Sequence, residues 1–194
     1  PELPTSQGQW GAHHYDQIGR MTGRLAVEGE TIDVDCWSMR DHSWGPRKVA
    51  KNQRGRFFWA IASERDAFLL WASSTHPLET DPVVGVPENV VGGWLLRDGV
   101  VGTIERGESF VHQRRPDGAP LADRVRAVDD LGRELVAEGR ATNTMIWPCY
   151  PTAFAWFSHF EWEIDGHTAQ GEEQEWLPIH QRRRFARGVR ASGR

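Results

Sequence analysis

The sequence of 194 residues predicts an all-β fold, an antiparallel barrel or sandwich formed by one domain. Short segments of alternating apolar and polar residues recur along the chain, and turn dipeptides such as Asp98-Gly99 separate them. Helical periodicity does not alternate with these segments, which argues against a parallel sheet with crossover helices. A chain of this length is large enough to bury a sizeable core without a second domain.

The expected strands follow one another along most of the chain. They span residues 14–27, 31–37, 57–63, 68–74, 93–97, 100–106, 109–115, 124–128, 134–142 and 154–164, of which the first is a bent strand or a strand pair. Turn residues separate them, as at Glu28-Gly29-Glu30 and Asp165-Gly166. Residues 121–136 have some helical character, but Gly132 and the β-branched side chains disfavour a helix.

The strand Phe154–Ile164 predicts how the sheet divides apolar from polar surface. Large apolar side chains share one face, and His159, Glu161 and Glu163 share the other. The chain also contains ten tryptophans, several times the average frequency, which indicates aromatic core layers or a lined cavity.

Charge is distributed unevenly between a body and a tail. Six of the 23 basic residues and none of the 27 acidic residues lie in residues 181–194. We therefore expect a single β-domain over residues 1–180 and a basic, flexible tail over 181–194. The tail has no interleaved aromatic residue apart from Phe185, and the body is acidic, so no nucleic-acid partner is expected.

Several classes of protein are disfavoured by missing motifs. Cys36 and Cys149 form no Cys-x-x-Cys pair, so a disulfide scaffold or zinc knuckle is not indicated and a cytoplasmic location is expected. The sequence shows no apolar run of transmembrane length and no signal-peptide core. Phosphate-binding loops, Gly-x-Ser-x-Gly elbows and dinucleotide fingerprints are also missing, which disfavours kinases, serine hydrolases and Rossmann enzymes.

The segment Met39–Arg47 concentrates chemical groups in a short stretch. It contains Arg40, Asp41, His42, Trp44 and Arg47 and turns at Gly45-Pro46. Burying charges beside aromatic rings is costly unless the charges pair. An acid presented next to rings that stabilise cations is a plausible site for proton chemistry on an apolar substrate.

The stretch Asp41-His42-Ser43-Trp44-Gly45 resembles the Asp-His-x-Trp-Gly signature of the lipocalin-like superfamily of carotenoid 1,2-hydratase and AttH-like proteins. The similarity of pattern extends from about Trp10 to Trp176, although its specificity lies in this motif, and it looks most like an uncharacterised bacterial branch. The resemblance implies a lipocalin-like barrel equivalent to the C-terminal half of a two-barrel protein. It also implies a partner for that half, either a second lipocalin-like domain or another copy of the chain.

The resemblance implies an activity as well. In the carotenoid hydratases an acid protonates an isolated C=C bond and water captures the cation. By this resemblance Asp41 is the general acid of a cofactor-independent hydratase or isomerase of the lyase class, and His42 orients it or transfers a second proton. Trp37 and Trp44 flank an apolar substrate of isoprenoid, steroid, polyketide or fatty-acyl type, held in a barrel cavity.

Further substrate-binding candidates are Arg40, Arg47, His14, His159 and Glu161, of which Arg47 suits a carboxylate, phosphate or thioester head group. We expect no metal and no cofactor, because adjacent His13 and His14 face opposite ways on a strand and no ligand spacing is present.

Two alternatives stay open at this stage. In the first, the chain is a non-catalytic carrier, and Asp41 pairs with an arginine to hold a structural turn. In the second, the chain is a pericyclase that acts through the shape of its cavity alone.

Overall fold

The computed structural model describes residues 13–45, 54–74, 84–150, 153–181 and 183. This part of the chain forms strands at His13–Val27 (β1), Glu30–Trp44 (β2), Gly55–Ile61 (β3), Ala67–Ser73 (β4), Glu88–Arg97 (β5), Val100–Arg114 (β6), Pro120–Asp129 (β7), Glu134–Tyr150 (β8), Ala153–Ile164 (β9) and His167–Pro178 (β10). A short helical turn follows β10 at residues 179–181. None of the described helical residues forms a helix long and apolar enough to cross a membrane.

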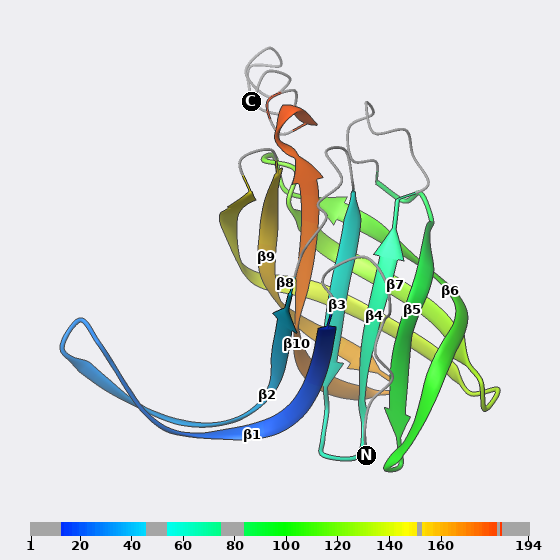
Figure 1. The fold of residues 1–194 in the computed structure, drawn as a ribbon, viewed down its shortest axis with the longest axis horizontal. Coiled ribbons are helices and arrows are strands. Elements are labelled where there is room, and N and C mark those ends of the chain that lie inside the picture. The colour runs from blue at the N-terminus through cyan, green and yellow to red at the C-terminus, as the bar shows by residue number, and fades with distance from the viewer. Residues whose placement is uncertain (1–12, 46–53, 75–83, 151–152, 182, 184–194) are drawn as a thin grey trace.

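Eight strands close into an antiparallel barrel (Figure 1). Their order is β10-β3-β4-β5-β6-β7-β8-β9, and β10 closes the ring by pairing with both β3 and β9. The predicted all-β class is therefore confirmed, and the architecture is a barrel consistent with a lipocalin-like one. Closure removes the free sheet edges that an open sheet would present to solvent.

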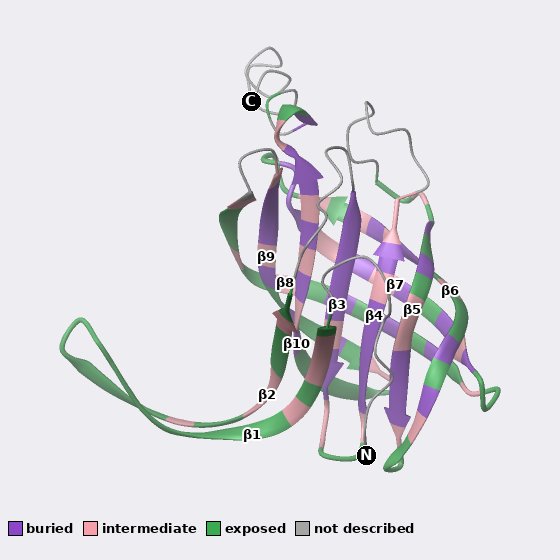
Figure 2. Cartoon of the chain, in the orientation of Figure 1, coloured by how far each residue is buried: buried purple, intermediate pink, exposed green. Residues whose placement is uncertain are grey.

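Strands β1 and β2 form a separate hairpin that lies outside the barrel. Figure 1 shows it leaving the barrel wall as a long curved arm. Near the barrel, Ile18, Trp37 and Met39 pack against the outer face of β3, β4 and β5, which presents Phe57 and Trp94. Residues 19–33 are exposed throughout, as Figure 2 shows in green, so only the near half of the arm is held by the barrel.

The apolar half of the barrel interior is filled by aromatic side chains. Phe58 and Phe160 both stack on Trp162, with ring centroids 6.0 and 5.3 Å apart, and all three are fully buried. The predicted apolar face of Phe154–Ile164 thus points inward, as the alternating burial of β9 shows. Core aromatic packing of this kind contributes both buried area and favourable ring geometry.

Several strands differ from the sequence prediction. Strand β5 begins at Glu88 and not at residue 93, and β8 continues to Tyr150 and not to residue 142. Strand β2 continues through Asp41 to Trp44, and β6 is one strand where two were expected, because irregular pairing between Ile104 and Arg106 absorbs the break. Strand β10 was not predicted at all. Within it Gly171, Glu173 and Glu175 alternate inward and are buried.

Gly171 lets β10 approach β3 closely where the barrel closes. A Cβ at this position would lie 1.8 Å from the carbonyl oxygen of Trp59, so the backbone would have to move. We therefore expect Gly171→Ala to lower the free energy of unfolding by about 1–3 kcal/mol, measured by urea denaturation. Gly19→Ala is the matched control, because its Cβ would meet no atom within 4 Å. Equal stability of the two variants would contradict this description of barrel closure.

Candidate functional site

The motif acid Asp41 lies on the hairpin and not inside the barrel. The turn at Glu28-Gly29 has positive φ at both residues, which fixes a two-residue connection and sets the register of β1 against β2. This register places Asp41 opposite Asp16 and places Ser43 opposite His14. Directly opposed residues point to the same side of a hairpin, so these four side chains share one face.

His14 is the centre of a polar group that we call the hairpin site, formed by His14, Asp16, Asp41 and Ser43. Nε2 of His14 lies 2.8 Å from Oδ2 of Asp16, and Nδ1 lies 2.7 Å from Oγ of Ser43. The same Nδ1 is 3.6 Å from Oδ1 of Asp41. The side chain of His14 is 8% exposed and that of Asp41 is 44% exposed, so Asp41 is the member of the pair that solvent or a ligand reaches.

The hairpin site faces the outer wall of the barrel. The ring of His14 meets the edge of Trp71 on β4, at a centroid distance of 5.9 Å. Glu172 on β10 is a third carboxyl group whose electrostatics are coupled to the hairpin site, after Asp16 and Asp41. Burial raises the pKa of Glu172, and the negative charge of Asp41 raises it further, whereas a hydrogen bond from Gln174 and the nearby His159 oppose the shift. A carboxyl group that binds its proton more tightly than usual therefore lies within electrostatic reach of Asp41.

The other motif side chains occupy the opposite face of the hairpin, as strand alternation requires. His42 lies between Tyr15 and Trp44, with ring centroids 5.5 and 5.2 Å away, and Trp44 stacks on His13. The guanidinium of Arg40 lies 5.4 Å from the ring of Tyr15. The structure thus brings His14, and not His42, into contact with Asp41.

Of the remaining predicted residues, Trp37 lies on the hairpin, and His159 and Glu161 lie on β9. Trp37 shares the face of Asp41 and packs against the barrel wall. His159 lies opposite Glu172 on β9, and its Nδ1 is 2.9 Å from the hydroxyl of Thr142. Glu161 is exposed and accepts a hydrogen bond from Gln170. Arg47 lies outside the described residues.

The contact between His14 and Asp41 had a signal in the sequence. A two-residue turn at Glu28-Gly29 pairs residues whose numbers are symmetric about it, which relates position 14 to 43 and 16 to 41. The prediction ended the second strand at Trp37 and therefore did not extend this register to the motif.

The hairpin site also has donors suitable for a cation. His14, Asp16 and Asp41 each offer one ligand atom, and these atoms lie within 4.8 Å of one another. One imidazole and two carboxylates are a set that divalent transition metals accept. Acidic groups gather in this way without a metal as well, so the geometry serves either a proton relay or a cation.

A second polar group, which the sequence analysis missed, lies within the barrel. We call it the polar end of the barrel interior, and its charged members are Arg54, Arg56, Arg114, Glu88, Asp123, Glu173 and Glu175. Arg56 is at its centre: Nε and Nη2 donate to Oε1 of Glu173 at 3.0 and 2.7 Å, Nη1 donates to Ser109 at 2.9 Å, and Nη2 also pairs with Asp123. Arg114 holds Glu175 through two hydrogen bonds of 2.6 and 3.1 Å.

Burial and the neighbouring arginines set the protonation of the acids at the polar end of the barrel interior. Burial raises the pKa of Glu173 to about 8, against the opposing charge of Arg56 and with support from the neighbouring Asp123 and Glu175. Burial also raises the pKa of Asp123. For Glu175 burial acts in the same direction, but the charge and hydrogen bonds of Arg114 outweigh it and lower the pKa. Glu173 therefore retains its proton at neutral pH, whereas Glu175 is ionised.

This protonation predicts how stability depends on pH. The folded chain binds the Glu173 proton more tightly than the unfolded chain, so between about pH 5 and 8 the unfolded state carries fewer protons at this site. The free energy of unfolding should then fall as pH rises through this range. Glu173→Gln, which mimics the protonated acid, should flatten the decline in urea denaturations at half-unit pH steps. An equally steep decline in the variant would contradict the assignment.

Comparison with known proteins gives one match. The family model described as a domain of unknown function, DUF7064, matches residues 2–178. Searches of curated proteins and of solved structures found no significant match. Because the model covers nearly the whole chain, hairpin and barrel together, the chain belongs to the DUF7064 family.

Proposed function

We propose that this protein binds an apolar small molecule and catalyses its cofactor-independent hydration or isomerisation, with Asp41 as the group that transfers the proton. Isoprenoid, steroid, polyketide and fatty-acyl molecules are the substrate classes we consider. The observation that carries the proposal is the half-exposed Asp41 carboxyl group, held 3.6 Å from a buried imidazole beside a tryptophan-rich wall.

An apolar substrate is favoured by the surface next to the hairpin site. Trp37 on the hairpin and Trp59, Trp71 and Trp176 on the barrel are only partly buried and belong to one apolar cluster. Indole faces attract hydrocarbon and stabilise a neighbouring positive charge. A carbocation formed by protonation of a C=C bond would therefore be stabilised by the same rings that bind the substrate.

The proton route runs along the hairpin site. Asp16 holds Nε2 of His14, which leaves Nδ1 directed to Ser43 and Asp41. An imidazole between two carboxylates can return a proton to Asp41 after each transfer. Glu172, whose pKa burial raises, supplies a second carboxyl group within electrostatic reach of Asp41.

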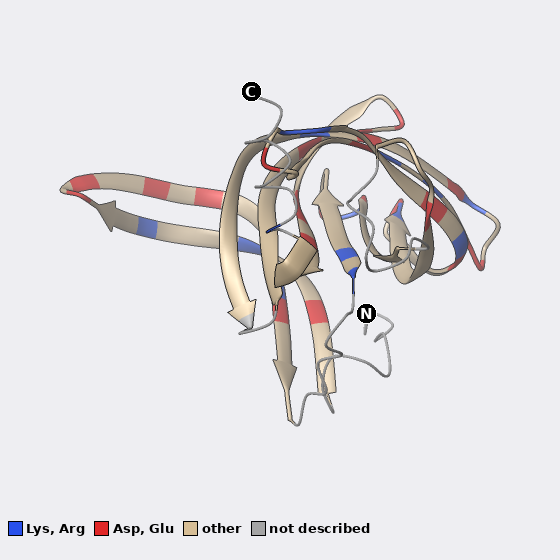
Figure 3. Cartoon of the chain, turned by 90° about the horizontal axis from the view of Figure 1, so that it is seen from above, with Lys and Arg blue, Asp and Glu red and all other residues tan. Residues whose placement is uncertain are grey.

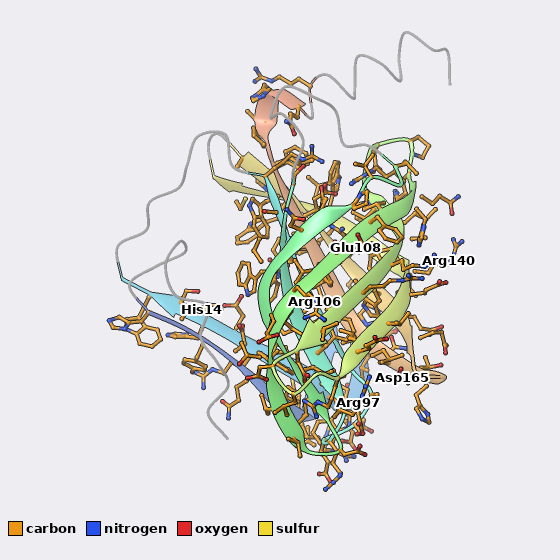
Figure 4. All side chains as sticks on the ribbon, turned by 90° about the vertical axis from the view of Figure 1, so that its right-hand side faces the viewer. His14, Arg97, Arg106, Glu108, Arg140 and Asp165 are labelled. Carbon is orange, nitrogen blue, oxygen red and sulfur yellow. The ribbon has the colours of Figure 1, made fainter. Side chains whose placement is uncertain are left out.

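The position of Asp41 changes where the substrate is expected to bind. Strand β2 pairs with β1 and lies outside the closed barrel, so a substrate that meets Asp41 binds between the hairpin and the outer wall. Figure 4 shows His14 on this hairpin, apart from the barrel surface that carries Arg106, Glu108 and Arg140. The proposed site is thus beside the barrel and not in its interior.

The exposure of Asp41 favours a second candidate function. An acid that is 44% exposed lacks the enclosure that usually keeps a catalytic carboxyl group protonated. If Asp41 donates no proton, the protein is a non-catalytic carrier of the same apolar molecules. A shape-driven pericyclase would depend on the tryptophans more than on Asp41.

The functions differ in their response to Asp41→Asn. Farnesol is a suitable isoprenoid probe, because binding quenches tryptophan fluorescence and hydration in H₂¹⁸O leaves a label that mass spectrometry detects. The proposal predicts that Asp41→Asn lowers the rate of label incorporation by about 10²–10⁴-fold while the farnesol Kd changes less than threefold. Asp35→Asn is the matched control, on the same strand and face but in an exposed ion pair with Arg20.

Each result of this comparison has a distinct meaning. Label incorporation that is equally fast in Asp41→Asn and Asp35→Asn would exclude Asp41 as the proton donor. Binding of farnesol to the unmodified protein without label incorporation, and with the double bonds of the recovered farnesol unchanged by NMR, would establish the carrier. Absence of both binding and incorporation would contradict an isoprenoid substrate.

The far half of the hairpin supports the expected partner. Met21, Leu25, Val27 and Ile32 are about half exposed, and the register places them on one face. The other face carries ion pairs between Arg20 and Asp35 and between Arg24 and Asp33; Figure 3 shows acidic and basic bands along the two strands of the arm. A two-stranded ribbon is only marginally stable by itself, so this apolar face needs cover.

We assign that cover to a second copy of the chain. Met145 and Trp147 on β8 form another exposed apolar patch, with Phe157 against Trp147, and a twofold dimer can pair an arm with such a patch twice. Light scattering after size exclusion should therefore give a mass near 44 kDa, twice the 22.0 kDa of one chain.

The arm variants test this assembly. Replacing Leu25 and Ile32, which lie opposite each other, by Asp should give a monomer. Replacing Thr22 and Thr31 by Asp adds the same charge on the other face and should leave the dimer intact. A monomeric unmodified chain at all concentrations would contradict the assignment of a second copy to this face.

A further inference from the structure

The polar end of the barrel interior contains more polar atoms than its ion pairs satisfy. Buried polar atoms in native proteins nearly always have hydrogen-bond partners. Here eight buried side-chain atoms have none among the described residues: Nη1 and Nη2 of Arg54, Nε of Arg114, Nε1 of Trp156, Nε2 and Oε1 of Gln181, Oε2 of Glu88 and Oε2 of Glu173. Arg54 approaches Glu88 and Glu175 only at 3.6 and 3.7 Å.

These atoms lie at one end of the barrel. Gly55 pairs with Trp176, so Arg54 lies beside the end of β10, and Gln181 follows in the turn directly after that strand. Trp156 is opposite Glu175 in the pairing of β9 with β10. Gln181, which the sequence analysis assigned to the flexible tail, is fully buried.

The unsatisfied atoms are mostly donors. Five of the eight are nitrogen atoms of guanidinium, indole or amide groups, which donate hydrogen bonds. A molecule that completes this end of the barrel must therefore offer acceptors, as a carbonyl oxygen does. Ala119, Phe154, Trp156 and Leu177 form a buried apolar cluster that a hydrocarbon part can contact.

The charges at this end disfavour an added anion. Three guanidinium groups face four carboxyl groups, of which Glu173 retains its proton, so the charges balance without an added anion; Nη2 of Arg54 forms longer ion pairs with Glu88 and Glu175. A further carboxylate would add an unbalanced buried charge next to Glu88 and Glu175, which is costly at low dielectric. An uncharged acceptor has no such penalty.

We propose that the polar end of the barrel interior binds a small uncharged molecule through its carbonyl oxygen, with Arg54, Trp156 and Gln181 as donors. This site is separate from the hairpin site, because it lies inside the barrel and shares none of its residues. It gives the protein a second ligand, distinct from the substrate proposed for Asp41.

Saturation-transfer NMR and titration calorimetry with 2-octanone and octanoate at pH 7 test the proposal on the full chain. The ketone should bind with a Kd below about 1 mM, at least about tenfold more tightly than octanoate. Gln181→Leu should weaken ketone binding about tenfold, since it removes one donor. Gln170→Leu is the matched control, because Gln170 is exposed on the outer side of β10. Asp41→Asn should leave ketone affinity unchanged.

A second variant keeps the test decisive if Gln181→Leu fails to fold, as judged by circular dichroism. Trp156→Phe removes the Nε1 donor together with part of the indole ring and keeps one aromatic ring in the core, and it should also weaken ketone binding. The proposal is overturned if 2-octanone does not bind, which is the result expected when water alone satisfies these atoms. It is equally overturned if octanoate binds as tightly, or if both variants bind the ketone like the unmodified chain.

Discussion

The interior of this barrel depends on the contacts of Arg56. Its guanidinium joins Glu173 of β10, Asp123 of β7 and Ser109 of β6 from a position on β3, so four strands meet at one buried cation. A charge removed from water in this way needs several partners, and losing any of them leaves another charge buried alone. This constraint explains why the polar end of the barrel interior is so rich in carboxyl groups. Phe58, Phe160 and Trp162 fill the apolar half, and the two parts meet where the guanidinium of Arg56 lies 5.2 Å from the ring of Phe58.

The barrel wall in turn supports the hairpin. Phe57, Trp71 and Trp94 point outward from β3, β4 and β5, and the near half of the hairpin covers them with Ile18, Trp37 and Met39. This packing fixes the hairpin against the wall just where His14 meets Trp71. The proposed chemistry at Asp41 therefore depends on side chains that the barrel turns outward, while the proposed ketone site depends on those it turns inward.

The sequence predicted the β class and the inward face of Phe154–Ile164 because large apolar residues alternate there with polar ones. It did not predict β10, because alternating glutamates look the same whether solvent or an arginine neutralises them. The partner of Glu173 is 117 residues away, and only the closed barrel brings Arg56 to it. At the candidate site the motif identified Asp41, and the prediction paired it with its neighbour His42. Strand alternation separates those two, and the hairpin register supplies His14 instead.

Hydrogen–deuterium exchange of the unmodified chain with saturating farnesol tests the central claim that substrate binds between the hairpin and the outer wall. Slower exchange is predicted in peptides that cover residues 37–44 of β2 and 170–176 of β10, since both line that junction. The far part of the arm, residues 19–33, should exchange at an unchanged rate. Protection confined to strands that face the barrel interior, with residues 37–44 unaffected, would contradict the account.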